Sequence, residues 1–165
     1  MSRKAEWING VANQSIEEFL EGLLELRQEV RCLKERMNQI DKQITSVSAA
    51  KLNGEIKGAG ISDISRLLEK LEEAREDVVE KLTELLDRES LGVLLIRKHP
   101  KETARTILRA RYIVGDSWKH IALIVCCYKD ISYPQRIKKE ALAYLSSHTN
   151  MKEIIAEAKI KRIIK

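Results

Sequence analysis

Residues 16–47 read IEEFLEGLLELRQEVRCLKERMNQIDKQITSV, and their apolar residues recur at steps that alternate between three and four. These positions are Ile16, Phe19, Leu23, Leu26, Val30, Leu33, Met37, Ile40, Ile44 and Val47. The spacing places a narrow apolar seam along one side of a helix, as in a coiled coil. A single helix cannot bury such a seam, so the pattern predicts a long helix that packs against another. Ser15 and Glu18 stand at capping-box spacing, which predicts where this helix starts.

A second seam follows a glycine-rich stretch. Residues 48–60, SAAKLNGEIKGAG, predict a flexible connector, after which Ser62 or Asp63 caps the next helix. The positions of the second seam are Ile61, Ile64, Leu68, Leu71, Arg75, Val78, Leu82 and Leu85. Arg75 is its polar exception. Arg75 either fixes register or oligomeric state from within the seam, or extends its head group past Ala74 to solvent.

Two seamed helices can fold back as an antiparallel hairpin or pair with a second chain. Further apolar residues lie beside the seams, namely Leu20, Leu24, Leu67, Val79 and Leu86. A stripe wider than one seam favours a bundle of more than two helices. We therefore expect a hairpin that forms a homodimer resembling a four-helix bundle. The expected dimerisation residues are Leu23, Leu26, Val30, Leu33, Met37 and Ile40.

Charge is distributed unevenly and suggests two domains, residues 1–96 and residues 97–165. The first carries 14 Lys/Arg and 19 Asp/Glu, a net charge of −5, and the second carries 16 and 6, a net charge of +10. Charged residues make up 33% of the chain and aromatic residues 4%, a composition typical of long helices. We expect an all-α fold, with an N-terminal helical hairpin or coiled coil and a basic C-terminal domain that can bind a polyanion.

The chain lacks the residue patterns of an enzyme or of a cofactor site. It has no Gly-rich phosphate loop, no paired-carboxylate site, and no Ser or Cys in the setting of a nucleophile. Cys32, Cys126 and Cys127 are expected to be free and buried, and the histidines are scattered, so no metal site is predicted. The N-terminus has no apolar signal core, and no stretch approaches the roughly 18 apolar residues of a membrane span. We expect a cytoplasmic protein without a membrane partner.

Residues 104–145 read ARTILRARYIVGDSWKHIALIVCCYKDISYPQRIKKEALAYL and predict three short helices separated by two breaks. The first helix is expected to end near Val114, with Gly115 as the left-handed residue that follows it. Asp116 or Ser117 then caps the second helix. Three short helices with two tight breaks are the pattern of a helix-turn-helix unit.

The third of these helices is expected to begin at Ser132, which stands at capping-box spacing from Gln135. One face is expected to bury Ile137, Ala141, Tyr144 and Leu145. The opposite face is polar and basic. Gln can hydrogen-bond adenine in the major groove, and Arg or Lys can bind guanine or phosphate. The predicted DNA-contacting residues are Ser117, Trp118, Lys119, Ser132, Tyr133, Gln135, Arg136, Lys138 and Lys139.

The stretch ILRARYIVGDSWKHIA, residues 107–122, resembles the helix-turn-helix of sigma-factor region 4. The matching positions are Leu108, Arg111, Tyr112, Gly115, Ser117, Ile121 and Ala122, and the later EALAYL is similar to the end of that family's recognition helix. With its helical N-terminal half, the chain resembles small phage-encoded regulators of Gram-positive bacteria, the RinA-like and ArpU-like late-gene activators. The motif covers about a quarter of the chain. From Ala122 to Ala141 the chain is about two residues longer than the sigma-like pattern, and the glycine common in that turn is missing.

This resemblance implies a sequence-specific transcription regulator of phage or prophage type, which acts as a dimer on double-stranded DNA. It also suggests RNA polymerase as a partner. Two alternatives stay open. One is a helical adaptor or assembly protein that docks on RNA polymerase or another protein, and the other is a small terminase-like packaging subunit.

Residues 150–165, NMKEIIAEAKIKRIIK, predict an amphipathic basic helix that Asn150 caps. Three roles are open for it. It can pack on the C-terminal domain, bind phosphates, or contact a partner.

Overall fold

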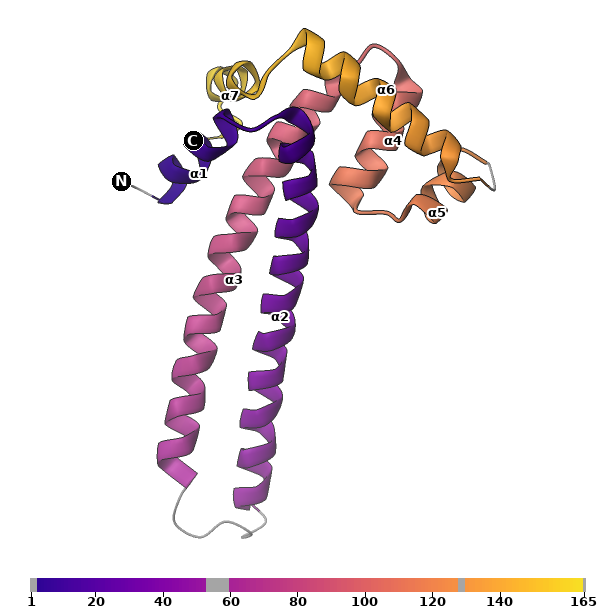
Figure 1. The fold of residues 1–165 in the computed structure, drawn as a ribbon. Coiled ribbons are helices and arrows are strands. Elements are labelled where there is room, and N and C mark those ends of the chain that lie inside the picture. Colours follow the sequence, from indigo (N-terminus) through magenta and orange to yellow (C-terminus); the bar gives the residue numbers. More distant parts are fainter. Residues whose placement is uncertain (1–2, 53–59, 128–129, 165) are drawn as a thin grey trace. The chain divides into compact units, whose positions relative to one another are not determined.

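The computed structural model describes residues 3–52, 60–127 and 130–164, and within these ranges every regular element is a helix. The all-α fold class is therefore confirmed. A short N-terminal helix precedes two long helices, and shorter helical segments follow (Figure 1). The first elements are α1 (Arg3–Ala12), α2 (Ile16–Leu52) and α3 (Gly60–Arg97). The later elements are α4 (Glu102–Leu108), the π-helical η1 (Arg109–Val114), α5 (Trp118–His120), the π-helical η2 (Ile121–Val125), α6 (Ser132–His148) and α7 (Met151–Ile160).

α2 begins where the sequence predicts. The backbone N–H of Ser15 donates to Glu18 Oε2 at 2.8 Å, and the N–H of Glu18 donates to Ser15 Oγ at 3.2 Å. These reciprocal bonds satisfy two amides at the helix start that lack a partner within the helix. The backbone bond from Ser15 is also the main reason that the pKa of Glu18 lies below its ordinary value.

The connector between the two long helices is shorter than predicted. α2 and α3 both extend into it, so the connector predicted at residues 48–60 and the cap predicted at Ser62 or Asp63 are wrong. Two alanines follow Ser48, and alanine is the strongest helix former. Adding residues to an existing helix is favourable, so α2 continues beyond the end of its seam. Residues 53–59 lie outside the described part of the chain.

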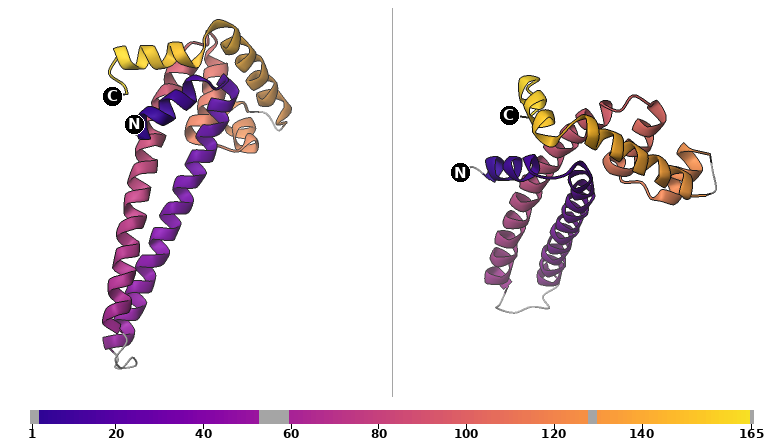
Figure 2. Two further views of the ribbon diagram at one scale, coloured as in Figure 1. Left: turned by 60° about the vertical axis from the view of Figure 1, so that its left-hand side comes forward. Right: turned by 45° about the horizontal axis from the view of Figure 1, so that its top comes forward.

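Residues 26–83 form one of two compact units, in which parts of α2 and α3 run side by side in opposite directions (Figures 1 and 2). Its core contains residues of both helices, namely Met37, Ile40, Ile44, Leu71 and Ala74. Lys81 Nζ lies 3.2 Å from Glu29 Oε1 and joins the helices by an ion pair. Of the two arrangements that the seams allow, the hairpin within one chain is the observed one.

The predicted dimerisation residues are enclosed by their own chain. Leu23, Leu26, Val30 and Ile40 are buried, and Leu33 and Met37 are partly buried. They stabilise the hairpin of one chain and leave little surface for a second chain, which would have to bind elsewhere. Arg75 is exposed, in agreement with the alternative in which its head group reaches solvent. The side chain of Ile61 lies outside the described residues.

The other compact unit contains residues 1–25 and 84–165. Many of its side chains are completely enclosed, among them Phe19, Leu20, Leu91, Leu95, Ile96, Ile107, Tyr112 and Leu145. A Cβ on Gly92 would lie 3.0 Å from the Cδ1 atoms of both Leu23 and Ile113, so glycine at this position lets α3 pack closely against both neighbours. The domain boundary predicted after residue 96 nearly coincides with the end of α3, whereas this compact unit extends back into the hairpin.

α7 packs beside α1 within this unit. Asn150 caps α7 as predicted, because its Oδ1 accepts a hydrogen bond from the N–H of Glu153 at 3.0 Å. The buried face of α7 consists of Met151, Ile154, Ile155 and Ala158. Lys98 Nζ also lies 2.5 Å from Glu157 Oε2. Of the three roles considered for residues 150–165, packing within the same chain is observed, but beside α1 of the N-terminal half and not on the C-terminal domain alone.

Candidate nucleic-acid interface

Three helical segments between residues 102 and 148 pack around a shared core. The first segment is α4 with η1, the second is α5 with η2, and the third is α6. α4 packs against α6, and η2 contacts both of them. Ile107, Ala110 and Ile121 are buried at the centre. Partly buried side chains surround them, namely Trp118, Val125, Cys126 and Ile137. All three helices that the sequence predicts here therefore contribute to one small core.

Gly115 ends the first segment in the predicted conformation. Its φ of 87° lies in the left-handed region, which a residue without Cβ adopts at little cost. The backbone N–H groups of Gly115 and Asp116 both donate to Ala110 O, at 3.1 and 2.9 Å. Arg111 Nη1 donates to Asp116 O at 3.0 Å. These bonds fix the direction in which the chain leaves η1.

Ser117 caps α5, because its Oγ accepts a hydrogen bond from the N–H of His120 at 3.2 Å. Trp118 is partly buried against the shared core, and the Arg111 guanidinium lies 5.2 Å from its ring centroid. Lys119 is exposed. Of the three DNA contacts predicted here, Lys119 offers an exposed cation, whereas Ser117 and Trp118 already have structural partners.

α6 begins at Ser132, but its cap differs from the prediction. Asp130 Oδ1 accepts a hydrogen bond from the N–H of Ser132 at 2.9 Å, and Ser132 Oγ donates to Asp130 Oδ2 at 2.5 Å. The predicted capping box between Ser132 and Gln135 is therefore wrong. The hydrogen bonds from the Ser132 side chain and backbone hold the pKa of Asp130 below its ordinary value.

The turn before α6 contains a left-handed residue that is not glycine. Cys127 has a φ of 57°, a conformation that glycine adopts without strain, and this is the turn in which the glycine of the sigma-like pattern is missing. Cys126 is partly buried, and burial raises the pKa of its thiol. Cys32 and Cys127 are exposed, so the expectation that all three thiols are buried is wrong. Tyr128 and Lys129 lie outside the described residues.

α6 presents two different faces. Its packed face holds the residues predicted for it, with Ala141 and Leu145 buried and Ile137 and Tyr144 partly buried. Gln135, Arg136 and Lys139 are exposed. Arg136 Nε lies 3.9 Å from Glu140 Oε1, but both side chains are mostly solvated, so this pair contributes little stability and leaves the guanidinium accessible. Tyr133 is partly buried, with the Arg136 guanidinium 5.7 Å from its ring centroid.

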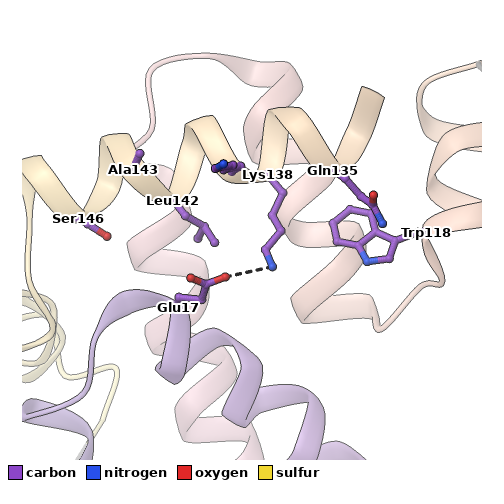
Figure 3. Close-up of a pocket in the computed structure, with 8 residues that line it drawn as sticks. Glu17, Trp118, Gln135, Lys138, Leu142, Ala143 and Ser146 are labelled. Atoms are coloured by element: carbon purple, nitrogen blue, oxygen red, sulfur yellow. Dashed lines mark ion pairs between the residues drawn. The ribbon is translucent and has the colours of Figure 1, made fainter. Parts of the chain in front are cut away.

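Lys138 contacts carboxylates of its own chain. Its Nζ lies 3.2 Å from Glu17 Oε1 (Figure 3). It also lies 3.2 Å from Glu21 Oε1, and both glutamates are at the start of α2. The Tyr112 hydroxyl donates to the same Glu21 oxygen at 2.9 Å. Lys138 is therefore not free to bind a phosphate in this arrangement. Nothing in the local spacing indicates this contact, because 117 residues separate Lys138 from Glu21.

A groove of about 530 Å³ lies beside this lysine, between α6, the start of α2 and Trp118 (Figure 3). Gln135 and Lys139 line it from α6, and Glu17 lines it from α2. Four of the predicted DNA-contacting side chains, Trp118, Gln135, Lys138 and Lys139, therefore line one groove together with a carboxylate.

Comparison with known protein families, curated proteins and solved structures gives no match for this chain. Within the described ranges, no group of three or more His, Cys, Asp or Glu residues is placed to hold a metal ion. None of the helices described here combines the length and the apolar character that a membrane crossing requires.

Proposed function

We propose that this protein is a sequence-specific transcription regulator of phage or prophage type that binds double-stranded DNA. The outer face of α6 carries this proposal, because Gln135, Arg136 and Lys139 are all exposed on a helix whose opposite face is packed. A helix held in this way by two others can enter the major groove with its outer side chains foremost. The phage assignment rests on the sequence resemblance alone.

The exposed side chains offer complementary chemistry toward DNA. The Gln135 amide can donate to and accept from one adenine, which supplies a sequence readout. Arg136 can bind guanine with two hydrogen bonds or hold a phosphate, and Lys139 suits a phosphate oxygen as a point charge. Lys119 adds a further exposed cation at the start of α5. Phosphate contacts fix the register of the protein on the duplex, and Gln135 provides the selectivity.

The charge of the C-terminal half also favours a polyanionic partner. Residues 97–165 carry 16 Lys/Arg and 6 Asp/Glu, an excess of ten cations. Some of these cations are paired, as Lys98 is with Glu157, but the compact unit of residues 1–25 and 84–165 still carries 19 Lys/Arg and 14 Asp/Glu, an excess of five cations. Binding to DNA would release condensed counterions, so the affinity should fall steeply with salt.

We further propose a homodimer that forms through the hairpin, at a surface other than the predicted one. Leu68 and Val79 are 48% and 64% exposed, and a spacing of eleven residues, about three turns, puts them on one side of α3. Residues 26–52 carry six Lys/Arg and three Asp/Glu, a net charge of +3, and residues 60–83 carry four and seven, a net charge of −3. The exposed apolar side of an acidic α3 can therefore bind the basic α2 of a second copy.

The test of DNA binding uses the full-length protein and fluorescence anisotropy at several salt concentrations. The protein should bind duplexes enriched from a random pool at least about 10³-fold more tightly than it binds the starting pool. The logarithm of Kd should rise linearly with the logarithm of the salt concentration. A protein that binds neither duplex at low salt would contradict the proposal.

A second candidate function is a protein adaptor that docks on RNA polymerase or another protein. Leu123, Ile124 and Ile131 are exposed around the turn before α6, and Ile124 is 67% exposed. The major groove offers thymine methyl groups but no broad apolar surface to cover these side chains. A variant with Leu123→Ser and Ile124→Ser that keeps its DNA affinity but no longer binds purified RNA polymerase would favour the adaptor.

A further inference from the structure

The lysine beside the proposed reading face of α6 is held by anions of its own chain. Lys138 Nζ lies 3.2 Å from one carboxylate oxygen of Glu17 and 3.2 Å from one of Glu21. An ammonium group binds two phosphate oxygens of a DNA backbone in the same way. The two carboxylates therefore occupy the place that a phosphate would need in order to bind Lys138.

This cluster is partly enclosed, so its charges interact more strongly than those of a surface pair. The side chain of Lys138 is 20% exposed, and the Tyr112 ring near its ammonium group is completely buried. Burial alone would lower the pKa of Lys138, but the contacts with Tyr112, Glu17 and Glu21 outweigh burial and raise it. Burial is also the main cause that raises the pKa of Tyr112 to about 12, so its hydroxyl stays protonated and donates to Glu21.

Neither carboxylate would be left without a hydrogen-bond donor or water if Lys138 moved away. Glu21 would keep its hydrogen bond from the Tyr112 hydroxyl. The side chain of Glu17 is 60% exposed, and solvent would hydrate it. An anion that keeps a donor or water does not incur the full cost of an unpaired buried charge. The contact between Lys138 and the two carboxylates can therefore break without a large loss of stabilisation at either carboxylate.

The Glu17 carboxylate also faces the groove that lies along α6. Glu17 lines this groove together with Gln135 and Lys139 (Figure 3). A DNA phosphate that approached these two side chains would meet a like charge in the same hollow. The repulsion would be strongest at low salt, where screening is weakest.

We propose that the first turns of α2 form an autoinhibitory element, in which Glu17 and Glu21 hold Lys138 and repel DNA. This inference rests on the proposed function, because it requires that α6 binds DNA. Binding then demands that Lys138 exchange its carboxylates for a phosphate. The element weakens binding to every duplex alike, so that only duplexes with favourable base contacts are bound at a given protein concentration.

The test compares full-length Glu17→Gln and Glu25→Gln proteins in their binding to a random-sequence duplex. Both variants remove one exposed negative charge from α2 about two turns apart, but Glu17 is the one that contacts Lys138. Glu17→Gln should bind about 3- to 10-fold more tightly at low salt, with a salt slope steeper by about one, because only Glu21 then competes with a phosphate for Lys138 and no Glu17 carboxylate is left to take up a cation from solution. Glu25→Gln should change the affinity by less than about twofold.

Lys138→Met separates the contact from the net charge. In that background Glu17→Gln should give a clearly smaller gain and no change of salt slope, because the lysine that it would release is absent and only the repulsion between Glu17 and DNA is removed. Equal gains in both backgrounds, equal gains for Glu17→Gln and Glu25→Gln, or no gain at all would overturn the inference. If the wild type still bound DNA in those cases, the proposed function would stand. If neither the wild type nor Glu17→Gln bound DNA at low salt, both would be overturned, and binding of the random-sequence duplex by the variant alone would support the inference.

Discussion

The two compact units of this protein enclose their cores to different degrees. In residues 1–25 and 84–165, side chains such as Ile96 and Tyr112 are completely buried. In residues 26–83, even the most buried of the described side chains keep some exposure, and Ile40 keeps 8%. Several crossing helices can surround a side chain on all sides, whereas two helices leave part of it open to solvent.

This difference indicates which unit is stably folded without a partner chain. The unit with enclosed side chains has the packing of a folded interior. The hairpin relies on its seams and on surface ion pairs such as Lys81 with Glu29. It leaves Leu68, a predicted seam position, and Val79, which lies beside the seam, exposed. A partner helix would add the contacts that the hairpin lacks. We therefore expect the unit of residues 1–25 and 84–165 to be stable in each chain and the hairpin to gain stability from a second copy.

The largest expected effect on stability comes from replacing one isoleucine by alanine in each unit. Ile96→Ala should destabilise the fold by about 3–5 kcal/mol, because a fully enclosed site cannot collapse around the cavity. Ile40→Ala should cost about 2 kcal/mol or less, because the hairpin can relax and water can enter. Urea unfolding of the full-length variants, followed by circular dichroism at one protein concentration, measures both losses. Equal losses would show that the hairpin core is enclosed as tightly as the other.

Local patterns account for most of what could be predicted from the sequence. The long helices follow from a seam repeated over nine steps, and their pairing follows from the need to bury it. The caps at Ser15 and Asn150 and the break at Gly115 depend on residues within a few positions, and the structure confirms all three. Periodicity and capping chemistry are sufficient to predict features that depend on residues close together in the sequence.

The features that were missed depend on competition or on distance along the chain. A seam does not reveal whether its own chain or a second chain covers it, so buried residues such as Val30 were predicted to dimerise. At the start of α6, the Asp130 carboxylate competes with Ser132 and Gln135 for the same role. The contact of Lys138 with Glu21 joins two distant segments, and no local pattern could predict it.

The second expected effect concerns the surface that joins two copies. Val79→Lys should raise the dimer Kd by about tenfold or more, because it places a cation against the basic α2 of the second copy in the proposed interface. Its helix content should not change, since Val79 is exposed in one chain. Val30→Glu should instead lower the helix content, since Val30 is buried within its own chain.

Light scattering and circular dichroism together distinguish these outcomes. Asp77→Asn, at an exposed position on a different side of α3, is the control and should leave both the mass and the helix content unchanged. A monomeric mass for the wild type at micromolar concentration would exclude the dimer.

The smallest expected effect is a loss of stability in acid within the tightly packed unit. The pKa of Glu157 is lowered from 4.5 to about 2, chiefly by the hydrogen bond from Lys161 and then by that from Lys98. Because the folded pKa is the lower one, these contacts stabilise the fold above pH 4.5 and are lost as the pH falls toward 2. Glu157→Gln should flatten the dependence of Tm on pH in this window. An unchanged dependence would contradict the role of these ion pairs.

The claim that the outer face of α6 reads DNA is tested most directly by one affinity, that of the combined Gln135→Ala, Arg136→Ala and Lys139→Ala variant for a duplex selected by the wild type. Loss of the Gln135 amide should cost about 1–3 kcal/mol on the selected duplex and little on random DNA. Each lost cation should weaken binding to both duplexes and reduce the salt slope by about one. The combined variant should therefore bind the selected duplex about 100-fold more weakly or worse, with unchanged helix content. An unaltered affinity would contradict DNA reading by α6 and would assign its exposed face to a protein partner.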